Sequence, residues 1–274
     1  MNFKNPDTNI LKDKKLFIFD MDGTIYLGGK PFDFAIKFIK NLRESGKKVI
    51  FFTNNASHTT PFYIEKLTRL GFSPTADEIM TSGDVTFEFL NRFRKGKSVY
   101  LVATDELVEE YRAKGINLLN GDEEKADIVI TSFDTSLTYA KLDNACRFIR
   151  KGAEYLSTHP DYNCPTETGF IPDSGAIAAF VTASTKVEPT YFGKPYKETI
   201  EMIGEATGFS REEMCIFGDR LYTDIALGKK FGVTSVLVLS GETQIDDVEA
   251  AAESDRPDYV FKSLAYVDDA MFGE

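Results

Sequence analysis

Short apolar runs recur along this chain and alternate with stretches whose apolar residues have helical spacing. In segment 32–45, for example, Phe34, Phe38, Ile39 and Leu42 fall on one helical face. Near-continuous apolar strands that alternate with helices are typical of a parallel sheet covered on both faces, so we predict an α/β protein. The predicted strands are Lys15–Asp20, Lys48–Thr53, Ser98–Thr104, Ala126–Ser132, Met214–Asp219, Thr234–Ser240 and Asp258–Phe261.

The predicted elements fall into three stretches of the chain. Residues 1–82 show the order strand, loop, helix, strand, loop, helix, and residues 187–274 show a similar order. The block between them has strands and helices of its own, enough for a separate α/β module. We therefore predict a parallel-sheet core domain in two segments, 1–82 and 187–274, with an inserted α/β domain at 83–186.

Charge and composition exclude several classes of function. The chain has 43 Asp and Glu against 32 Lys and Arg, a formal net charge of −11, which argues against a nucleic-acid polymer as partner. No apolar run approaches the roughly 20 residues of a membrane span, so we expect no membrane partner. The polar N-terminus lacks a signal-peptide core, and we expect a cytoplasmic protein.

Cysteine and histidine are too few for several kinds of site. Three cysteines without a CxxC pair argue against a disulfide framework and against a cysteine zinc site. Two histidines make a histidine-rich metal site or a Ser-His-Asp hydrolase a poor fit. A metal ion in this protein is therefore expected to be held by oxygen.

The sequence Asp20-Met21-Asp22-Gly23-Thr24 directly follows an apolar strand. Ligands of open parallel α/β sheets bind at the carboxyl ends of strands, so both carboxylates stand where chemistry is expected. Two carboxylates at one site repel each other unless a cation or a shared proton compensates, and oxygen ligands of this kind suit Mg²⁺. The alternative is a polar turn with solvated acids.

Three later segments repeat this arrangement of polar residues at a strand end or turn. Alone, the first could be a helix N-cap and the second an ordinary surface loop, whereas the two acids of the third are spaced so that both can face one cation. Four such features in one order are far more specific than any single one. The three segments are Thr53-Asn54-Asn55, Phe192-Gly193-Lys194-Pro195, and Gly218-Asp219 with Asp224.

Together, these four segments resemble the four motifs of the haloacid dehalogenase superfamily of phosphohydrolases, in the same order. That resemblance implies a Rossmann-like core, and the insertion resembles a type IIA cap domain. The Thr-Asn-Asn stretch, Thr81–Asp84 and the Gly-Lys-Pro turn are similar to the NagD-like branch. This branch includes phosphatases of p-nitrophenyl phosphate, nucleotide monophosphates and phosphoglycolate.

The resemblance implies a role for each acidic residue. Asp20 would be the nucleophile that forms an aspartyl phosphate, and Asp22 the general acid and then general base. Mg²⁺ would be bound by the Asp20 carboxylate, the Asp22 backbone carbonyl and the Asp219 carboxylate. Asp224 would lie in the outer shell, positioning Lys194 or a metal-bound water.

The resemblance also implies the groups that contact substrate. Thr53, Asn54 and Lys194 would bind the phosphate oxygens, which carry the charge of the transferred group. In the inserted domain, the loop Ser157–Pro165 resembles the cap loop that contacts the substrate, which makes His159 and Asp161 candidates. A turn built by the prolines of this loop is the alternative.

We therefore expect a Mg²⁺-dependent phosphatase of small phosphorylated metabolites. The substrate would be a sugar phosphate, a nucleotide monophosphate, phosphoglycolate or p-nitrophenyl phosphate, and the enzyme a monomer or homodimer. A phosphomutase or phosphotransferase could use the same aspartyl phosphate. A non-catalytic signalling or binding protein with a phosphorylated aspartate is the alternative from another class, although a receiver domain would be less than half as long.

Overall fold

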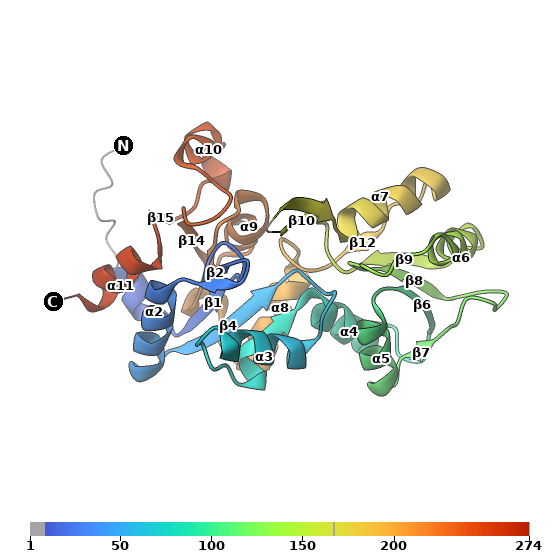
Figure 1. Cartoon of the computed structure of the whole chain (residues 1–274), viewed down its shortest axis with the longest axis horizontal. Helices are drawn as coiled ribbons and strands as arrows, with labels where there is room; N and C mark the ends of the chain where they lie inside the picture. Colours follow the sequence, from blue (N-terminus) through green and yellow to red (C-terminus); the bar gives the residue numbers. More distant parts are fainter. Residues whose placement is uncertain (1–8, 167, 274) are drawn as a thin grey trace. The chain divides into compact units, whose positions relative to one another are not determined.

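The computed structural model describes residues 9–166 and 168–273 and divides the chain into two compact units (Figure 1). Unit 1 comprises Met1–Phe52, Ile64–Met80 and Ile200–Glu274. Unit 2 comprises Thr53–Tyr63 and Thr81–Thr199. Among the residues described, none of the helices has the length and apolar character needed to span a membrane.

Unit 1 is built on a six-stranded sheet with the order β15-β14-β13-β1-β4-β5. Its central strand β1 is fully buried and pairs in parallel with β13 and β4, so that Phe19 lies opposite Phe217 on one side and Phe51 on the other. Residues that follow these three phenylalanines therefore emerge at one edge of the sheet. The strands are β1 (Leu16–Phe19), β4 (Lys48–Thr53), β5 (Ile79–Thr81), β13 (Met214–Gly218), β14 (Thr234–Val238) and β15 (Tyr259–Phe261).

Aromatic rings join the sheet of unit 1 to its helices. Phe38, on the predicted apolar face of α2, meets Phe19 edge-on with ring centroids 6.0 Å apart, and Phe19 stacks on Phe217 at 4.9 Å. Helix α11 lies beside α2, where Asp268 accepts a hydrogen bond from Asn41 (Figure 1). The helices that lie wholly or partly in unit 1 are α1 (Asn9–Asp13), α2 (Asp33–Glu44), α3 (Thr60–Arg69), α8 (Lys197–Thr207), α9 (Ala226–Phe231), α10 (Ile245–Ala250) and α11 (Leu264–Phe272).

Unit 2 has a parallel five-stranded sheet of its own, in the order β12-β9-β8-β6-β7. Its core packs the ring of Tyr100 against that of Phe148, with centroids 5.2 Å apart. The predicted parallel-sheet α/β class is therefore confirmed. The strands and helices are β6 (Ser98–Val102), β7 (Asn117–Leu118), β8 (Ile128–Thr131), β9 (Glu154–Ser157), β12 (Thr190–Tyr191), α4 (Ser82–Phe93), α5 (Asp105–Ala113), α6 (Tyr139–Arg150) and α7 (Ser174–Thr185).

Two short antiparallel hairpins and four short helical turns complete the described elements. The hairpins pair β2 (Tyr26–Leu27) with β3 (Lys30–Pro31) and β10 (Asn163–Thr166) with β11 (Gly169–Pro172). The turns are η1 (Ala76–Glu78), η2 (Arg211–Glu213), η3 (Leu221–Ile225) and η4 (Glu253–Asp255).

The two units divide the chain at other residues than the predicted domains 1–82, 83–186 and 187–274. Residues 187–199 belong to unit 2, because β12 pairs with β9 and thereby extends the sheet of unit 2 past residue 186. Residues 53–63 also belong to unit 2, where the Thr104 hydroxyl donates a hydrogen bond to the Ser57 carbonyl. A strand as short as β12 leaves no clear signal in the sequence.

Candidate active site

The loop after β1 carries the first pair of carboxylates. The Asp20 N–H still continues the sheet ladder by donating to the Phe217 carbonyl at 2.8 Å. The chain then turns at Gly23, which has a φ of +82° and donates to the Tyr26 carbonyl at 2.7 Å. Glycine suits this turn because other residues avoid a positive φ. The turn holds Asp20 and Asp22 at the carboxyl end of the central strand.

The loop after β13 carries the second pair. Asp219 directly follows the strand, and Asp224 lies in the π-helical turn η3. Both residues are buried, with exposed fractions of 2% for Asp219 and 0% for Asp224. A Cβ on Gly218 would overlap the Asp224 side chain, so the absence of a side chain there makes room for this carboxylate.

Three of these four carboxylates form a cluster. Asp20, Asp219 and Asp224 each offer an oxygen, and these oxygens all lie within 4.8 Å of one another. Burial, followed by the charges of Asp20 and Asp224, raises the pKa of Asp219 to about 8. Asp224 is as buried as Asp219, and its predicted outer-shell position stays a prediction.

The cluster has the chemistry of a cation site. One oxygen of Asp219, Oδ2, accepts a hydrogen bond from the Glu242 N–H at 2.7 Å. The other, Oδ1, is buried and has no hydrogen-bond partner within the described residues. A buried carboxylate oxygen is costly unless a donor or a cation satisfies it. The residues present therefore fit a hard divalent cation, which prefers carboxylate oxygen.

Asp22 differs from the clustered carboxylates. Burial raises its pKa above the ordinary value, although Lys66, an N–H of Gly28 and Arg220 each act to lower it. A carboxyl group with a raised pKa keeps its proton closer to neutral pH, which suits a general acid. Lys66 also donates to the Tyr26 hydroxyl at 2.9 Å.

The Thr-Asn-Asn segment follows β4, the neighbour of β1 in the sheet of unit 1. The Thr53 hydroxyl accepts the Asn55 N–H at 3.1 Å, and the Asn55 side chain accepts the Ser57 N–H at 2.9 Å. Helix α3 begins only at Thr60, so neither Thr53 nor Asn54 is its N-cap. The segment is a separate polar turn.

In unit 2, the Asn54 side chain holds the main chain of Lys194. Its Oδ1 accepts the Lys194 N–H at 2.8 Å, and its Nδ2 donates to the Lys194 carbonyl at 3.0 Å. The same Nδ2 lies 3.2 Å from Asp161 Oδ2. The structure thus brings Asn54, Asp161 and Lys194 together, and the Asn54 amide is engaged at both ends by protein groups.

His159 is fully buried in unit 2 and belongs to a hydrogen-bonded network. Its Nε2 lies 2.8 Å from Asp173 Oδ1, and its Nδ1 lies 3.0 Å from the Thr158 hydroxyl and 3.2 Å from that of Ser82. Burial lowers the pKa of His159, but the charge and hydrogen bond of Asp173 and the charge of Asp161 outweigh it, and the net pKa is raised.

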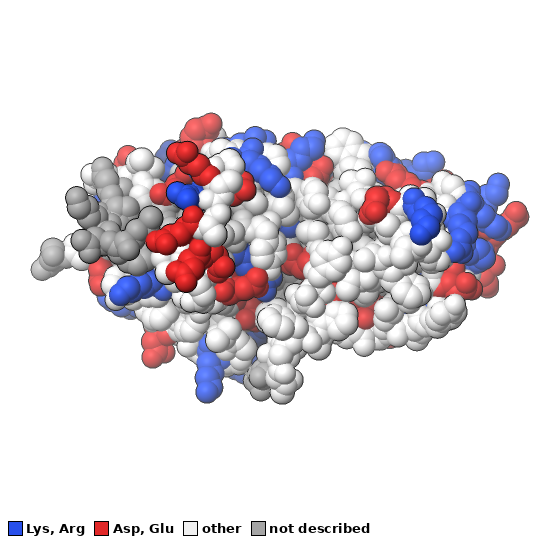
Figure 2. Space-filling view, turned by 90° about the horizontal axis from the view of Figure 1, so that it is seen from above, with Lys and Arg blue, Asp and Glu red and all other residues white. Residues whose placement is uncertain are grey.

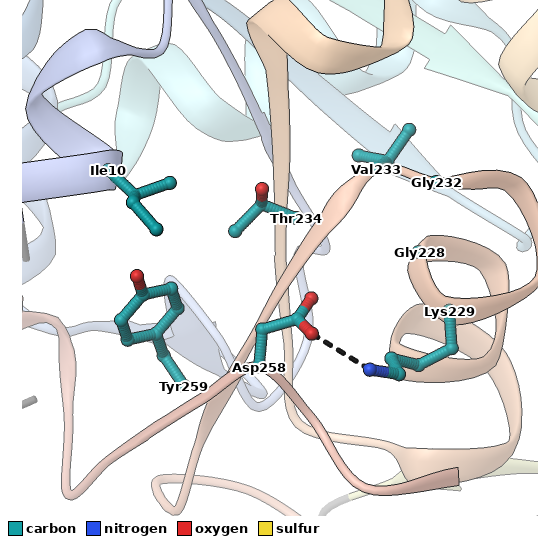
Figure 3. A pocket seen from close by; sticks show the side chains of 8 residues that line it. All are labelled: Ile10, Gly228, Lys229, Gly232, Val233, Thr234, Asp258 and Tyr259. Atoms are coloured by element: carbon teal, nitrogen blue, oxygen red, sulfur yellow. Dashed lines mark hydrogen bonds and ion pairs between the residues drawn. The ribbon is translucent and has the colours of Figure 1, made fainter. Parts of the chain in front are cut away.

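A separate pocket of about 560 Å³ in unit 1 is lined by residues of the segments around α1, α9, β14 and β15 (Figure 3). It is found where β14 and β15 begin, lined by residues such as Thr234 and Tyr259, whereas Asp20 and Asp219 follow the ends of their strands. Its charged groups pair with each other, because Lys229 Nζ lies 2.8 Å from Asp258 Oδ1.

Comparisons with known proteins agree with this geometry. Residues 17–117 match the family described as haloacid dehalogenase-like hydrolase, and residues 191–267 match a second family of the same hydrolases. The acid sugar phosphatase of Staphylococcus saprophyticus is 33% identical over 254 residues, which cover 93% of this chain and 96% of that protein. The chain belongs to the haloacid dehalogenase-like hydrolases.

Solved structures place the chain within this superfamily. The 4-nitrophenylphosphatase of Thermotoga maritima is 40% identical with a TM-score of 0.89, and the match covers 96% of this chain and 99% of that one. A NagD protein is 37% identical with a TM-score of 0.86, covering 93% of this chain and 98% of that one. The chain is therefore a NagD-like member of the haloacid dehalogenase-like hydrolases and a phosphoric monoester hydrolase.

Several residues that contact the predicted site residues were not predicted from the sequence. Asp173 contacts His159 opposite Ser82, which lies in the predicted Thr81–Asp84 stretch, while Arg220 and Glu242 approach Asp219. The sequence did hold a signal for Glu242, because it lies in a Ser-Gly-Glu-Thr stretch that follows an apolar strand, as the predicted motifs do. Asp173 had no such signal.

Proposed function

We propose that this protein is a Mg²⁺-dependent phosphatase that hydrolyses small phosphomonoesters through an aspartyl phosphate on Asp20. The acidic cluster of unit 1 carries the proposal. It combines a strand-end carboxylate, Asp20, with the buried Asp219, whose Oδ1 has no hydrogen-bond partner in the part of the chain that the structure describes. The neighbouring Asp22, with its raised pKa, supplies the acid that such a reaction needs.

Asp20 and Asp22 divide the reaction into two displacements. In the first, an Asp20 oxygen bonds to phosphorus, the ester P–O bond breaks, and Asp22 gives its proton to the departing oxygen, which leaves as an alcohol. In the second, Asp22 takes a proton from water, the water oxygen bonds to phosphorus, and the bond to Asp20 breaks. Inorganic phosphate leaves, and both carboxyl groups return to their starting states.

Mg²⁺ is the proposed cation. The Asp20 and Asp219 carboxylates and the Asp22 backbone carbonyl would hold it, with Asp224 in the outer shell. When bound, it would offset the charge of the carboxylates and of the phosphate oxygens. The carboxylates of Asp20 and Asp219 fit a divalent cation because they lie close to each other and to Asp224 at the end of a buried strand.

Thr53, Asn54 and Lys194 are proposed to bind the phosphate oxygens. Lys194 would contribute its positive charge, and the Asn54 side chain, besides its proposed contact with phosphate, holds the Lys194 main chain at its N–H and its carbonyl. Unit 2 is proposed to act as the cap that selects the substrate, with His159 and Asp161 in this role. The buried hydrogen bonds of His159 suggest that it sets the shape of its loop.

A small phosphorylated metabolite is the proposed substrate. Named relatives act on sugar phosphates and on 4-nitrophenyl phosphate, which supports this class. Sugar phosphates, nucleotide monophosphates and phosphoglycolate are the candidates for a substrate panel. Transfer of the phosphoryl group to a second sugar in place of water would indicate a phosphomutase or phosphotransferase.

The test measures phosphate release from p-nitrophenyl phosphate by the whole chain. We expect activity with Mg²⁺, loss of activity with EDTA, and recovery when Mg²⁺ is added in excess. Asp20→Asn should lower kcat by at least about a thousandfold, because no other group forms the covalent bond. Asp33→Asn, an exposed aspartate in the first turn of α2, is the matched control and should retain activity. Full activity of Asp20→Asn would overturn the nucleophile assignment.

A further inference from the structure

The segment Ser240–Thr243, which we call the β14 loop, binds both loops that carry the acidic residues of unit 1. The Ser240 hydroxyl donates to the Gly23 carbonyl at 2.8 Å. The Glu242 N–H donates to Asp219 Oδ2 at 2.7 Å, and the Thr243 N–H donates to the Asp219 carbonyl at 3.1 Å. The β14 loop therefore fixes both the main chain and the carboxylate of Asp219.

Two glycines bring main chain against this carboxylate. A Cβ on Gly241, in the β14 loop, would overlap the Asp219 carboxylate, and so would a Cβ on Gly23. Close approach of a backbone to a functional group is a common reason for glycine. Asp219 is thus enclosed by two glycine backbones and one N–H donor, which together restrict the direction of its free oxygen Oδ1.

The Glu242 side chain fastens the β14 loop to the segment after β13. Its Oε2 lies 3.0 Å from Arg220 Nε, and its Oε1 accepts the Tyr222 hydroxyl at 2.9 Å. Arg220 is the residue next to Asp219, and Tyr222 lies in the turn η3 that also contains Asp224. Glu242 therefore holds Asp219 by its main chain and holds the residues after Asp219 by its side chain.

Stability alone is a weak reason for this arrangement. Tyr222 is 56% exposed and the Glu242 side chain 43% exposed, so their contact contributes little to folding stability, whereas the Arg220 side chain that pairs with Glu242 is 15% exposed. Partners that orient a metal ligand, by contrast, commonly change metal affinity by about ten- to a hundredfold when removed.

We propose that Glu242, Arg220 and Tyr222 are positioning residues that aim Asp219 at the cation. The inference rests on the proposed function, because it concerns the same cation site. The three residues act through Asp219 and are not required to touch substrate. Removal of the Glu242 carboxylate would leave the β14 loop held only by Ser240 and by its N–H groups, and the Glu242 N–H would then hold Asp219 less firmly.

Calorimetric titration with Mg²⁺ alone tests this proposal. Tyr222→Phe and Glu242→Ala should weaken Mg²⁺ binding by about three- to thirtyfold, and Glu242→Gln, which keeps one acceptor oxygen, should fall between wild type and Glu242→Ala. In a phosphatase assay, the half-saturating Mg²⁺ concentration should rise by the same factor, while kcat at saturating Mg²⁺ stays near that of wild type. Tyr266→Phe, another half-exposed tyrosine of unit 1, is the matched control.

The outcomes separate this inference from the proposed function. If wild type binds Mg²⁺ but Tyr222→Phe and Glu242→Ala bind it equally well, the inference is overturned and the proposed function stands. If wild type binds Mg²⁺ no better than Asp219→Asn, both are overturned. A lower unfolding temperature of the metal-free variants with unchanged Mg²⁺ affinity would indicate a structural role and overturn the inference.

Discussion

Asp219 shows how burial and neighbouring charge prepare a carboxylate for a cation. Asp219 is 2% exposed, and one of its oxygens accepts a hydrogen bond from the Glu242 N–H. Burial, followed by the charges of Asp20 and Asp224, raises the pKa of Asp219 to about 8. Near neutral pH, such a group binds either a proton or a cation, because a bare buried charge is unfavourable. Protons and metal therefore compete, and metal affinity should fall as the pH falls.

The same residue predicts how the stability of the metal-free protein depends on pH. An unfolded Asp loses its proton near pH 4, whereas folded Asp219 keeps its proton up to about pH 8. Between these values the folded state binds more protons, so the free energy of unfolding should decrease as the pH rises, and Asp219→Asn should flatten that slope. Urea unfolding in EDTA at several pH values measures the slope in wild type and in Asp219→Asn.

Mg²⁺ provides the control for this prediction. At pH 8, added Mg²⁺ should restore the stability of the wild-type protein. It should have little effect on Asp219→Asn, because this variant lacks the carboxylate that is proposed to bind Mg²⁺. Asp33→Asn, with its exposed side chain, should keep the wild-type slope. A slope in Asp219→Asn as steep as in wild type would contradict the assignment of the pH dependence to this residue.

At the scale of elements, the sequence allowed the acidic cluster to be predicted because a parallel sheet brings strand ends together. The apolar runs before Asp20 and Asp219 became β1 and β13, which are neighbours in the sheet, and the polar residues that follow them lie at one edge. This inference needs only the strand direction and the position of the carboxylates after each strand.

The contacts that orient these groups could not be predicted in the same way. Glu242 meets Arg220 and Tyr222 through side chains from different loops, and no spacing along the chain encodes such a pair. The link between His159 and Asp173 likewise depends on where helix α7 begins, since Asp173 is its N-cap. The short strands β9 and β12 escaped for a simpler reason, because a few residues give no clear period.

Two glycines in helices predict opposite effects of the same substitution. Gly204 lies within α8, where an added Cβ would make ordinary contacts at 3.5 Å with Met214 and Phe209. Gly204→Ala should therefore stabilise the protein by about 0.5–1 kcal/mol, since alanine has the higher helix propensity. In α7, a Cβ on Gly175 would overlap the Pro160 carbonyl, so Gly175→Ala should destabilise the protein by about 1–3 kcal/mol.

Chemical unfolding of the two variants against wild type measures these effects. The two substitutions add the same methyl group to a helix, so each controls for the other. Destabilisation by Gly204→Ala, or no effect of Gly175→Ala, would show that the space around these glycines differs from that described.

Across the whole molecule, net charge is a poor guide to what the protein binds. Of the formal net charge of −11, a large part comes from residues 242–274, which hold ten acidic and two basic residues. Figure 2 shows acidic side chains gathered on the face of unit 1 where α10 lies. Most of these acidic side chains lie on a solvated surface, whereas the potential at any one site is set by the nearest charges, such as a bound cation.

The division into two units predicts that Mg²⁺ and phosphate affect different parts of the chain. The proposed metal ligands belong to unit 1, whereas Thr53, Asn54 and Lys194 belong to unit 2. Mg²⁺ alone should slow amide hydrogen exchange at Glu242 and Thr243, whose N–H groups donate to Asp219. The Lys194 N–H, which donates to Asn54, should respond only when inorganic phosphate is added with Mg²⁺.

Hydrogen exchange followed by mass spectrometry or NMR measures this response. Ligand at about a hundred times its Kd stabilises the bound state by about 2.7 kcal/mol. Amides that exchange only after the ligand has left should therefore exchange about a hundredfold more slowly. Asp219→Asn should abolish the Mg²⁺ effect at Glu242 and Thr243, because it removes a charged oxygen from the proposed cation site. Equal slowing in wild type and Asp219→Asn would place the cation elsewhere, since a ligand can protect only the state it binds.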